Sequence, residues 1–133
     1  MKPQSESFRD EFEVIKLHYV EKLSKQVRDI RTKWHLFKKY QVKRELIENI
    51  YSNVHKISGS AGVFGCGAVG DIAAGLEIEL KWIMEHEATL SIDEESTILR
   101  HIESLMHEVD VAMERRVIRH QDSSPPDQTQ VPP

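Results

Sequence analysis

The sequence lacks the features that mark several other classes of protein. It has one cysteine, Cys66, so no disulfide can form within the chain, which fits a reducing compartment. It has no run of about 18 apolar residues, and we therefore expect neither a membrane-spanning helix nor a membrane partner. The first residues, MKPQSESFRDEFE, are charged where a signal peptide would be apolar. These absences lead us to expect a cytoplasmic protein.

Proline and strand patterns are equally scarce in most of the chain. Four of the five prolines lie in residues 121–133, QDSSPPDQTQVPP, and we expect this tail to be disordered. No segment alternates apolar and polar residues with a period of two, so no strand is expected. Residues 1–120 are enough for one compact domain.

Four segments instead carry apolar residues at every third or fourth position, which is the spacing of amphipathic helices. They cover residues 7–40, 41–64, 68–86 and 91–119, with a connecting loop at 87–91. Ser91, followed three residues later by Glu94, is the signature of a capping box. Short connections between such helices predict an all-α fold, an antiparallel up-down four-helix bundle with a long N-terminal helix.

The first segment has the longest apolar stripe. It consists of Phe8, Phe12, Ile15, Tyr19, Leu23, Val27, Ile30, Trp34 and Phe37. At about 1.5 Å per residue this helix would be roughly 50 Å long, more than a small bundle requires. Either a break near Ser24 or an overhang used for pairing would accommodate the length. The oligomeric state is left open, with a monomer favoured. Trp34 and Trp82 are expected to anchor the core.

Charge is unevenly distributed, although the formal net charge is only −4. Residues 22–44 hold nine Lys or Arg and one acid, whereas residues 71–114 hold twelve acids and two Lys or Arg. Such a polarised bundle would orient a docking partner, or the two regions would simply attract each other within the fold. The basic cluster of Lys38, Lys39, Lys43 and Arg44 comes with no reading motif, so no nucleic-acid partner is expected.

The segment Val54–Gly62 carries the candidate chemistry. On a helix with about 100° per residue, His55 lies roughly 120° from the centre of the apolar face, so its ring is expected to point to solvent. Gly59 and Gly62 follow one and two turns later on the same face. Each glycine inside a helix costs about 1 kcal/mol relative to alanine. Close approach of another protein to His55 would justify that cost.

These residues suit the transfer of a phosphoryl group between proteins. Neutral imidazole is a nucleophile near physiological pH, because its unperturbed pKa is about 6.5. A ring nitrogen of His55 would attack an aspartyl phosphate of a partner and later pass the group on. Lys56 and the hydroxyls of Ser52 and Ser58 are candidates to hold the phosphoryl oxygens. We expect no metal site and no cofactor in this chain, since Mg²⁺ would come with the partner.

The same segment resembles the signature of the histidine-containing phosphotransfer (HPt) domain family. Residues 55–61 read H-K-I-S-G-S-A and are followed by Gly65 and by the pair Leu76-Glu77. The family reads His-x-Leu-Lys-Gly-Ser-Ala, then a glycine, then a Leu-Glu pair in the next helix. The likeness is detailed over residues 47–80 and extends more loosely to the whole four-helix layout.

This resemblance implies that His55 is the phosphorylated residue and that Gly59 is its small neighbour one turn along. It also implies docking of response-regulator receiver domains on the second and third helices, in a pathway with a hybrid histidine kinase. Where the family commonly has a lysine, this chain has Ser58, and Lys56 offers a cation about 100° around the helix. Without a nucleotide-binding domain, no ATP-dependent kinase activity is expected. The alternative is a helical interaction module that transfers nothing, such as a scaffold or kinase inhibitor.

Other patterns in the sequence are weaker. Residues 65–70 match G-x-G-x-x-G, but helical patterns and no strands surround them, so we expect an interhelix turn rather than a dinucleotide site. Glu103 and His107 are spaced by four residues, yet two ligands do not make a metal site. Cys66 is expected to pack at the end of the second helix.

Overall fold

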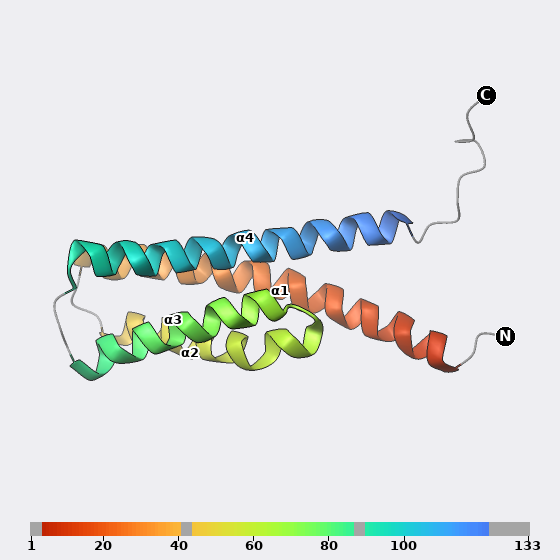
Figure 1. The fold of residues 1–133 in the computed structure, drawn as a ribbon, viewed down its shortest axis with the longest axis horizontal. Helices are drawn as coiled ribbons and strands as arrows, with labels where there is room; N and C mark the ends of the chain where they lie inside the picture. The colour runs from red at the N-terminus through yellow and green to blue at the C-terminus, as the bar shows by residue number, and fades with distance from the viewer. Residues whose placement is uncertain (1–3, 41–43, 87–89, 123–133) are drawn as a thin grey trace, which may run out of the picture.

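The structure is a computed structural model that describes residues 4–40, 44–86 and 90–122. Within these ranges it contains four α-helices, one short 3-10 helix and no strand. The elements are α1 (Gln4–Tyr40), α2 (Arg44–Ser60), η1 (Ala61–Phe64), α3 (Gly67–His86) and α4 (Ile92–Asp122). Figure 1 shows successive α-helices running in opposite directions along one long axis. The expected all-α helical bundle is confirmed.

The helix boundaries differ from expectation in two places. α1 is continuous, so the break considered near Ser24 is absent, and its N-terminal part extends beyond the turn that joins α2 to α3 (Figure 1). The single helix expected over residues 41–64 is divided into α2 and η1, which places Gly62 in a 3-10 turn. α4 continues to Asp122, past its expected end near residue 119.

Three expectations concern residues outside the described part of the chain. They are the disordered tail beyond residue 122, the contribution of Lys43 to the basic cluster, and residues 87–89 of the expected loop. Among the described helices, none is both long enough and apolar enough to cross a membrane.

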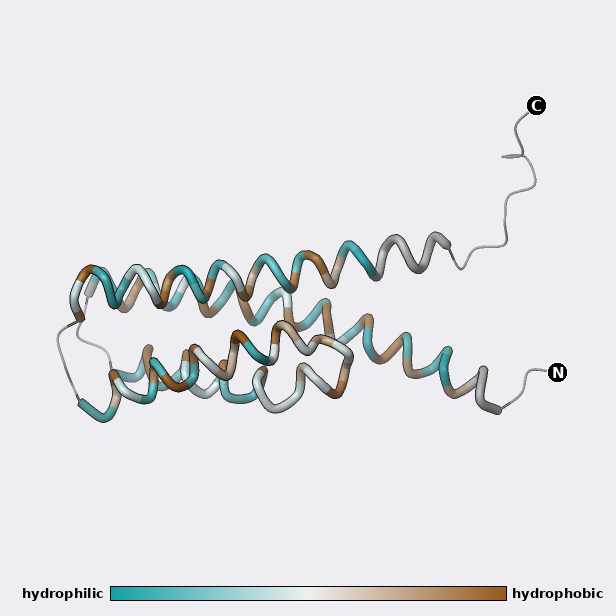
Figure 2. The backbone as a smooth tube through the Cα atoms, viewed as in Figure 1, coloured by the Kyte–Doolittle hydropathy of each residue, from teal (hydrophilic) through white to brown (hydrophobic). Residues whose placement is uncertain are grey.

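One hydrophobic core draws residues from every helix. Its members include Leu23, Val27, Ile30 and Trp34 of α1, Ile47, Ile50, Val54 and Ile57 of α2, Val69, Ala73, Leu76 and Leu80 of α3, and Ile98, Ile102, Leu105 and Val109 of α4. In Figure 2 hydrophobic residues recur at regular intervals along these helices, as amphipathic segments require. The three-and-four spacing of the sequence therefore located most of the core.

The two tryptophans have different environments. Trp34 has no exposed surface and is the largest buried side chain. Trp82 is 44% exposed, so the expectation that it anchors the core is wrong. The reason is its phase on α3: Leu76, Leu80 and Ile83 face the core, and Trp82 lies on the flank, where its ring stacks on His86.

A glycine turn joins α2 to α3. Gly65 has a φ of 77°, a left-handed conformation that favours glycine. The N–H groups of Gly65 and Cys66 donate to the carbonyls of Gly62 and Ala61 at 3.2 and 2.8 Å. These hydrogen bonds satisfy carbonyl groups of η1 that would otherwise have no donor. The interhelix turn is confirmed, and Cys66 packs against the core at the helix end as expected. This turn sets α2 and α3 side by side.

The charged regions attract each other across the α1–α4 interface. Arg28 of α1 lies 3.7 Å from Asp110 of α4, and Lys38 of α1 lies 4.0 Å from Glu95 of α4. Exposed pairs of this kind contribute about 0–1 kcal/mol each. Part of the charge asymmetry therefore serves the bundle itself.

Candidate functional site

His55 lies on the exposed face of α2, as its helix phase predicts. Its neighbours Val54 and Ile57 are buried, which fixes the rotation of α2 and turns His55 outward. The His55 side chain is 66% exposed, and its ring lies 6.2 Å, centroid to centroid, from that of Tyr51. Its Nδ1 is 2.5 Å from Oε1 of Glu77 on α3.

This contact with Glu77 determines which ring nitrogen of His55 carries the proton. An ionised carboxylate only accepts hydrogen bonds, so Nδ1 of His55 must carry the proton and donate it. In the neutral ring the lone pair is then on Nε2, the nitrogen that does not face Glu77. The hydrogen bond from His55 is the main cause that holds the pKa of Glu77 below its usual value, while partial burial acts in the opposite direction.

Ser58 holds the second oxygen of the same carboxylate. Its Oγ lies 2.9 Å from Oε2 of Glu77 and also 2.9 Å from the carbonyl oxygen of His55. The hydroxyl that we expected to hold a phosphoryl group therefore lies beside Glu77. Ser58 and His55 together engage both oxygens of Glu77, and this limits how the carboxylate and the imidazole can rotate.

Sequence reasoning gave Glu77 no role of its own beyond the family likeness. Glu77 and His55 are 22 residues apart and meet only because the glycine turn sets the register of α2 against α3. A helix wheel drawn for one segment contains no information about that register. The signal in the sequence is the Leu76-Glu77 pair of the family likeness, which sets an acidic residue beside a core position of α3.

The surface beside His55 is bare. Gly59 and Gly62 are exposed, and a Cβ added at either would meet no atom within 4 Å. The packing of the bundle therefore does not require glycine at these positions. Val63 and Ile78, which follow Gly62 and Glu77 in the chain, are 68% and 72% exposed. We call His55, Gly59 and Gly62 the His55 face.

Lys56 and Ser52 are two further residues expected to hold the phosphoryl oxygens. Lys56 is exposed next to His55, and Ser52 is exposed one turn before it. Lys81 follows Glu77 by one turn of α3, and its charge contributes to the lowered pKa of Glu77. The Lys81 side chain is 62% exposed, with Nζ 3.9 Å from Glu85. Lys81 was not singled out by the sequence pattern.

A second histidine–glutamate pair offers a comparison. Nδ1 of His101 on α4 contacts Oε1 of Glu79 on α3, and His101 is 40% exposed. Unlike His55, it has Leu105, a core residue, four positions along its helix instead of a glycine. His101 therefore shares the carboxylate contact but lacks the bare surface, which makes it a matched control for His55.

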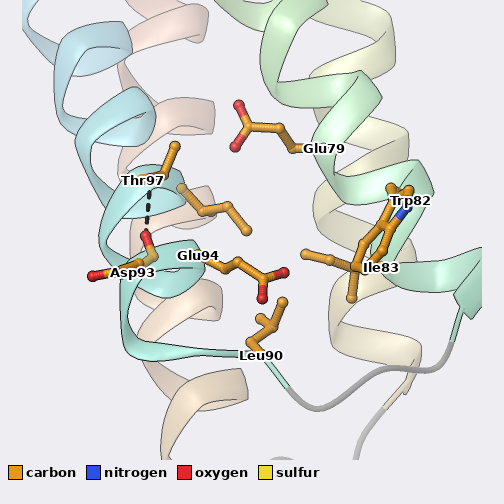
Figure 3. Close-up of a pocket in the computed structure, with 8 residues that line it drawn as sticks. Glu79, Trp82, Ile83, Leu90, Asp93, Glu94 and Thr97 are labelled. Atoms are coloured by element: carbon orange, nitrogen blue, oxygen red, sulfur yellow. Dashed lines mark hydrogen bonds between the residues drawn. The ribbon is translucent and has the colours of Figure 1, made fainter.

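A hollow of about 250 Å³ opens between the end of α3 and the start of α4 (Figure 3). It is lined by Glu79, Trp82, Ile83, Leu90, Asp93, Glu94, Thr97 and Ile98. The capping box is confirmed at its edge: Ser91 Oγ accepts the N–H of Glu94 at 3.1 Å, and Glu94 Oε1 accepts the N–H of Ser91 at 3.3 Å. None of the residues of the His55 face lines this hollow.

No metal centre is found in the part of the chain that the structure describes. No three of its His, Cys, Asp or Glu side chains are grouped so as to hold an ion. Glu103 and His107 both lie on exposed positions of α4. They remain two residues on a solvated helix face.

The lowered pKa of Glu77 predicts a pH-dependent stability. A carboxylate favoured by the fold stabilises the protein fully above its ordinary pKa of 4.5, and this contribution disappears as the pH falls through the lower folded-state value. We expect Glu77→Gln to reduce the free energy of unfolding at neutral pH and to differ less from the wild type as the pH falls below 4.5. Urea unfolding of both proteins across that range measures the difference. Glu103→Gln, at an exposed position, is the control, and a difference independent of pH would contradict the assignment.

The chain was compared with protein-family models, curated proteins and solved structures. Residues 15–112 match the family model described as Hpt domain. No curated protein and no solved structure matched the chain. The matched residues include His55, Glu77 and the core segments of all four helices.

Proposed function

Because the chain belongs to the Hpt domain family, which acts in histidine phosphotransfer in phosphorelay signalling, we propose that His55 carries the phosphoryl group. It accepts the group from an aspartate of a receiver domain and passes it to another receiver. The hydrogen bond between His55 and Glu77 is the observation that carries this proposal. A cytoplasmic location, a hybrid histidine kinase upstream and Mg²⁺ held by the receiver belong to the same proposal.

The hydrogen bond between His55 and Glu77 supports a transfer without a separate general base. The Nε2 lone pair of His55 attacks the phosphorus of the aspartyl phosphate, and the P–O bond breaks with its electron pair on the aspartate. The proton stays on Nδ1, so the ring becomes positively charged as the N–P bond forms. Glu77 stabilises that charge, and Ser58 keeps the carboxylate in position. The reverse steps release the group to the next aspartate.

The His55 face supports docking of a receiver domain. Its two glycines leave the imidazole unshielded, and the exposed apolar residues Val63 and Ile78 follow Gly62 and Glu77 in the chain. Lys56 and Lys81 flank it with positive charge, which takes over part of the role of the lysine that Ser58 replaces. An incoming phosphoryl group would therefore meet cations at the edge of the site and a carboxylate behind the ring.

The space above Gly59 allows a test that separates folding from docking. We expect Gly59→Ala to stabilise the protein by about 0.5–1 kcal/mol, because alanine is the better helix former and its Cβ meets no atom. We expect Gly59→Gln to fold as well as the wild type yet to accept phosphate at least about tenfold more slowly, because its side chain covers the approach to His55. Urea unfolding and transfer rates give both readouts. Equal transfer rates for the two variants would argue against docking over Gly59.

The function itself is tested by incubating the protein with a phosphorylated receiver domain. We expect acid-labile, base-stable label on the chain, followed by its return to an unlabelled receiver. A protein that folds and binds the receiver but takes up no label would instead support the alternative, a module that binds without transferring. The replacement of the usual lysine by Ser58 is the feature that favours that alternative.

A further inference from the structure

The hollow between α3 and α4 has the size of one side chain. Its volume of about 250 Å³ lies below the roughly 300–1,000 Å³ of pockets that hold small-molecule ligands. Ile83 and Ile98, both core residues, form part of its lining together with Leu90. An apolar base of this size suits the hydrocarbon stem of a long side chain from another protein.

The charged groups that line the hollow are acidic. Among the described residues its lining includes Glu79, Asp93 and Glu94 and no lysine or arginine. Figure 3 shows the carboxylates of Glu79 and Glu94 pointing into the gap from opposite helices, whereas Asp93 points away. Oε1 of Glu79 lies in contact with Nδ1 of His101, and Oε1 of Glu94 accepts the N–H of Ser91. An incoming cation would meet the Oε2 atoms.

Trp82 forms one wall of the same hollow, and this accounts for its half-exposed position on α3. Trp82 is 44% exposed, and its ring stacks on His86 with 4.4 Å between centroids. An indole face beside carboxylates attracts a cation, and a planar guanidinium stacks on it better than a lysine ammonium does. Two carboxylates facing each other also match the several N–H donors of a guanidinium.

We propose that this hollow binds an arginine side chain presented by a partner protein. The stem of the arginine lies over Ile83 and Ile98, and its guanidinium lies between Glu79 and Glu94 against Trp82. Glu79 faces α4, whereas Glu77, two residues earlier, faces α2 and His55. The carboxylates of Glu77 and Glu79 thus point to opposite flanks of α3, and a side chain bound in the hollow leaves the imidazole of His55 accessible.

Capped amino acids test the chemistry of the hollow directly. The protein is titrated with N-acetyl-argininamide, N-acetyl-lysinamide and N-acetyl-citrullinamide, the last being a neutral analogue of arginine with nearly the same shape, and the indole N–H signals are followed by NMR. We expect the arginine probe to shift the signal of Trp82 and not that of buried Trp34. We expect the citrulline probe to bind at least about tenfold more weakly. Equal binding of citrulline or of lysine would overturn the assignment to arginine.

Paired substitutions show whether the hollow or the acidic surface as a whole is recognised. We expect Glu79→Gln with Glu94→Gln to weaken binding of the arginine probe by at least about fivefold. Glu85→Gln with Glu103→Gln removes the same charge from α3 and α4 outside the hollow and should leave binding unchanged. Equal weakening by both pairs would show that the probe is attracted by the overall negative charge and not bound in the hollow. That result would overturn the proposal.

Two further readouts keep the outcome clear. Glu94 also caps α4, so Trp82→Leu provides a variant that leaves the cap intact, and we expect it too to weaken the arginine probe. In the phosphotransfer assay, Glu79→Gln with Glu94→Gln should accept label from a receiver at the wild-type rate. A loss of transfer in that folded variant would show that the receiver itself docks at the hollow. It would overturn the proposal that the hollow binds a partner other than the receiver.

Discussion

Replacing His55 with alanine is expected to abolish phosphorylation of the chain by a phosphorylated receiver domain. The substitution removes the only atom to which we assign the N–P bond, and no nearby group replaces it: Ser58 lies within reach but its hydroxyl is held by Glu77. The loss should therefore reach the detection limit rather than a modest rate change, as removal of a nucleophile usually does. Acid-labile label on the chain is the measurement.

His101 provides the matched control for this experiment. Its Nδ1 contacts a different carboxylate of α3, that of Glu79, and it has Leu105 where His55 has Gly59. His101→Gln should accept label at the wild-type rate, since it leaves the His55 face unchanged. Label that persisted in His55→Ala and vanished in His101→Gln would move the phosphoryl site to α4.

Replacing Trp34 with alanine is expected to have the largest effect on stability. Trp34 is fully buried among core residues of the bundle, and emptying so large a volume costs about 3–5 kcal/mol. A domain of this size has about 5–15 kcal/mol of net stability, so the variant should unfold at a much lower urea concentration, if it folds at all. Urea unfolding followed by circular dichroism measures the change.

Trp82→Ala is the control for the loss of a tryptophan as such. Because Trp82 is 44% exposed and packs on the flank of α3, its removal should cost less than about 1.5 kcal/mol. Similar losses for the two variants would contradict the burial that separates them. Trp34→Phe should cost less than Trp34→Ala because it keeps an aromatic ring in the core. The Nε1 of Trp34 is buried without a hydrogen-bond partner, so replacing the indole with a phenyl ring removes no hydrogen bond.

Much of the fold followed from the sequence because helix periodicity is a local property. The stripe from Leu23 to Trp34 is buried as its spacing predicts, and Ser91 and Glu94 form their capping box. The same stripe misled at Phe8, which is 68% exposed because α1 extends beyond its partners. Periodicity identifies an apolar face, but only the lengths of neighbouring helices decide whether that face is covered.

The site was predictable in part for the same reason. The exposure of His55 and Gly59 follows from their phase on one helix, and the structure agrees. The contact with Glu77 and the turn of Ser58 toward that carboxylate both depend on how α3 is set against α2. That register is established by the glycine turn and the core together, and no single segment encodes it.

The spacing of Glu77 and Glu79 has a consequence for how the length of this chain can vary. Two residues apart on α3, they reach opposite neighbours, His55 on α2 and His101 on α4. Inserting or deleting one residue between Gly67 and Leu76 would rotate both carboxylates by about 100° and break both contacts at once. Relatives of this protein should therefore vary less in the length of the first half of α3 than in the length of the N-terminal part of α1, which extends beyond its partners.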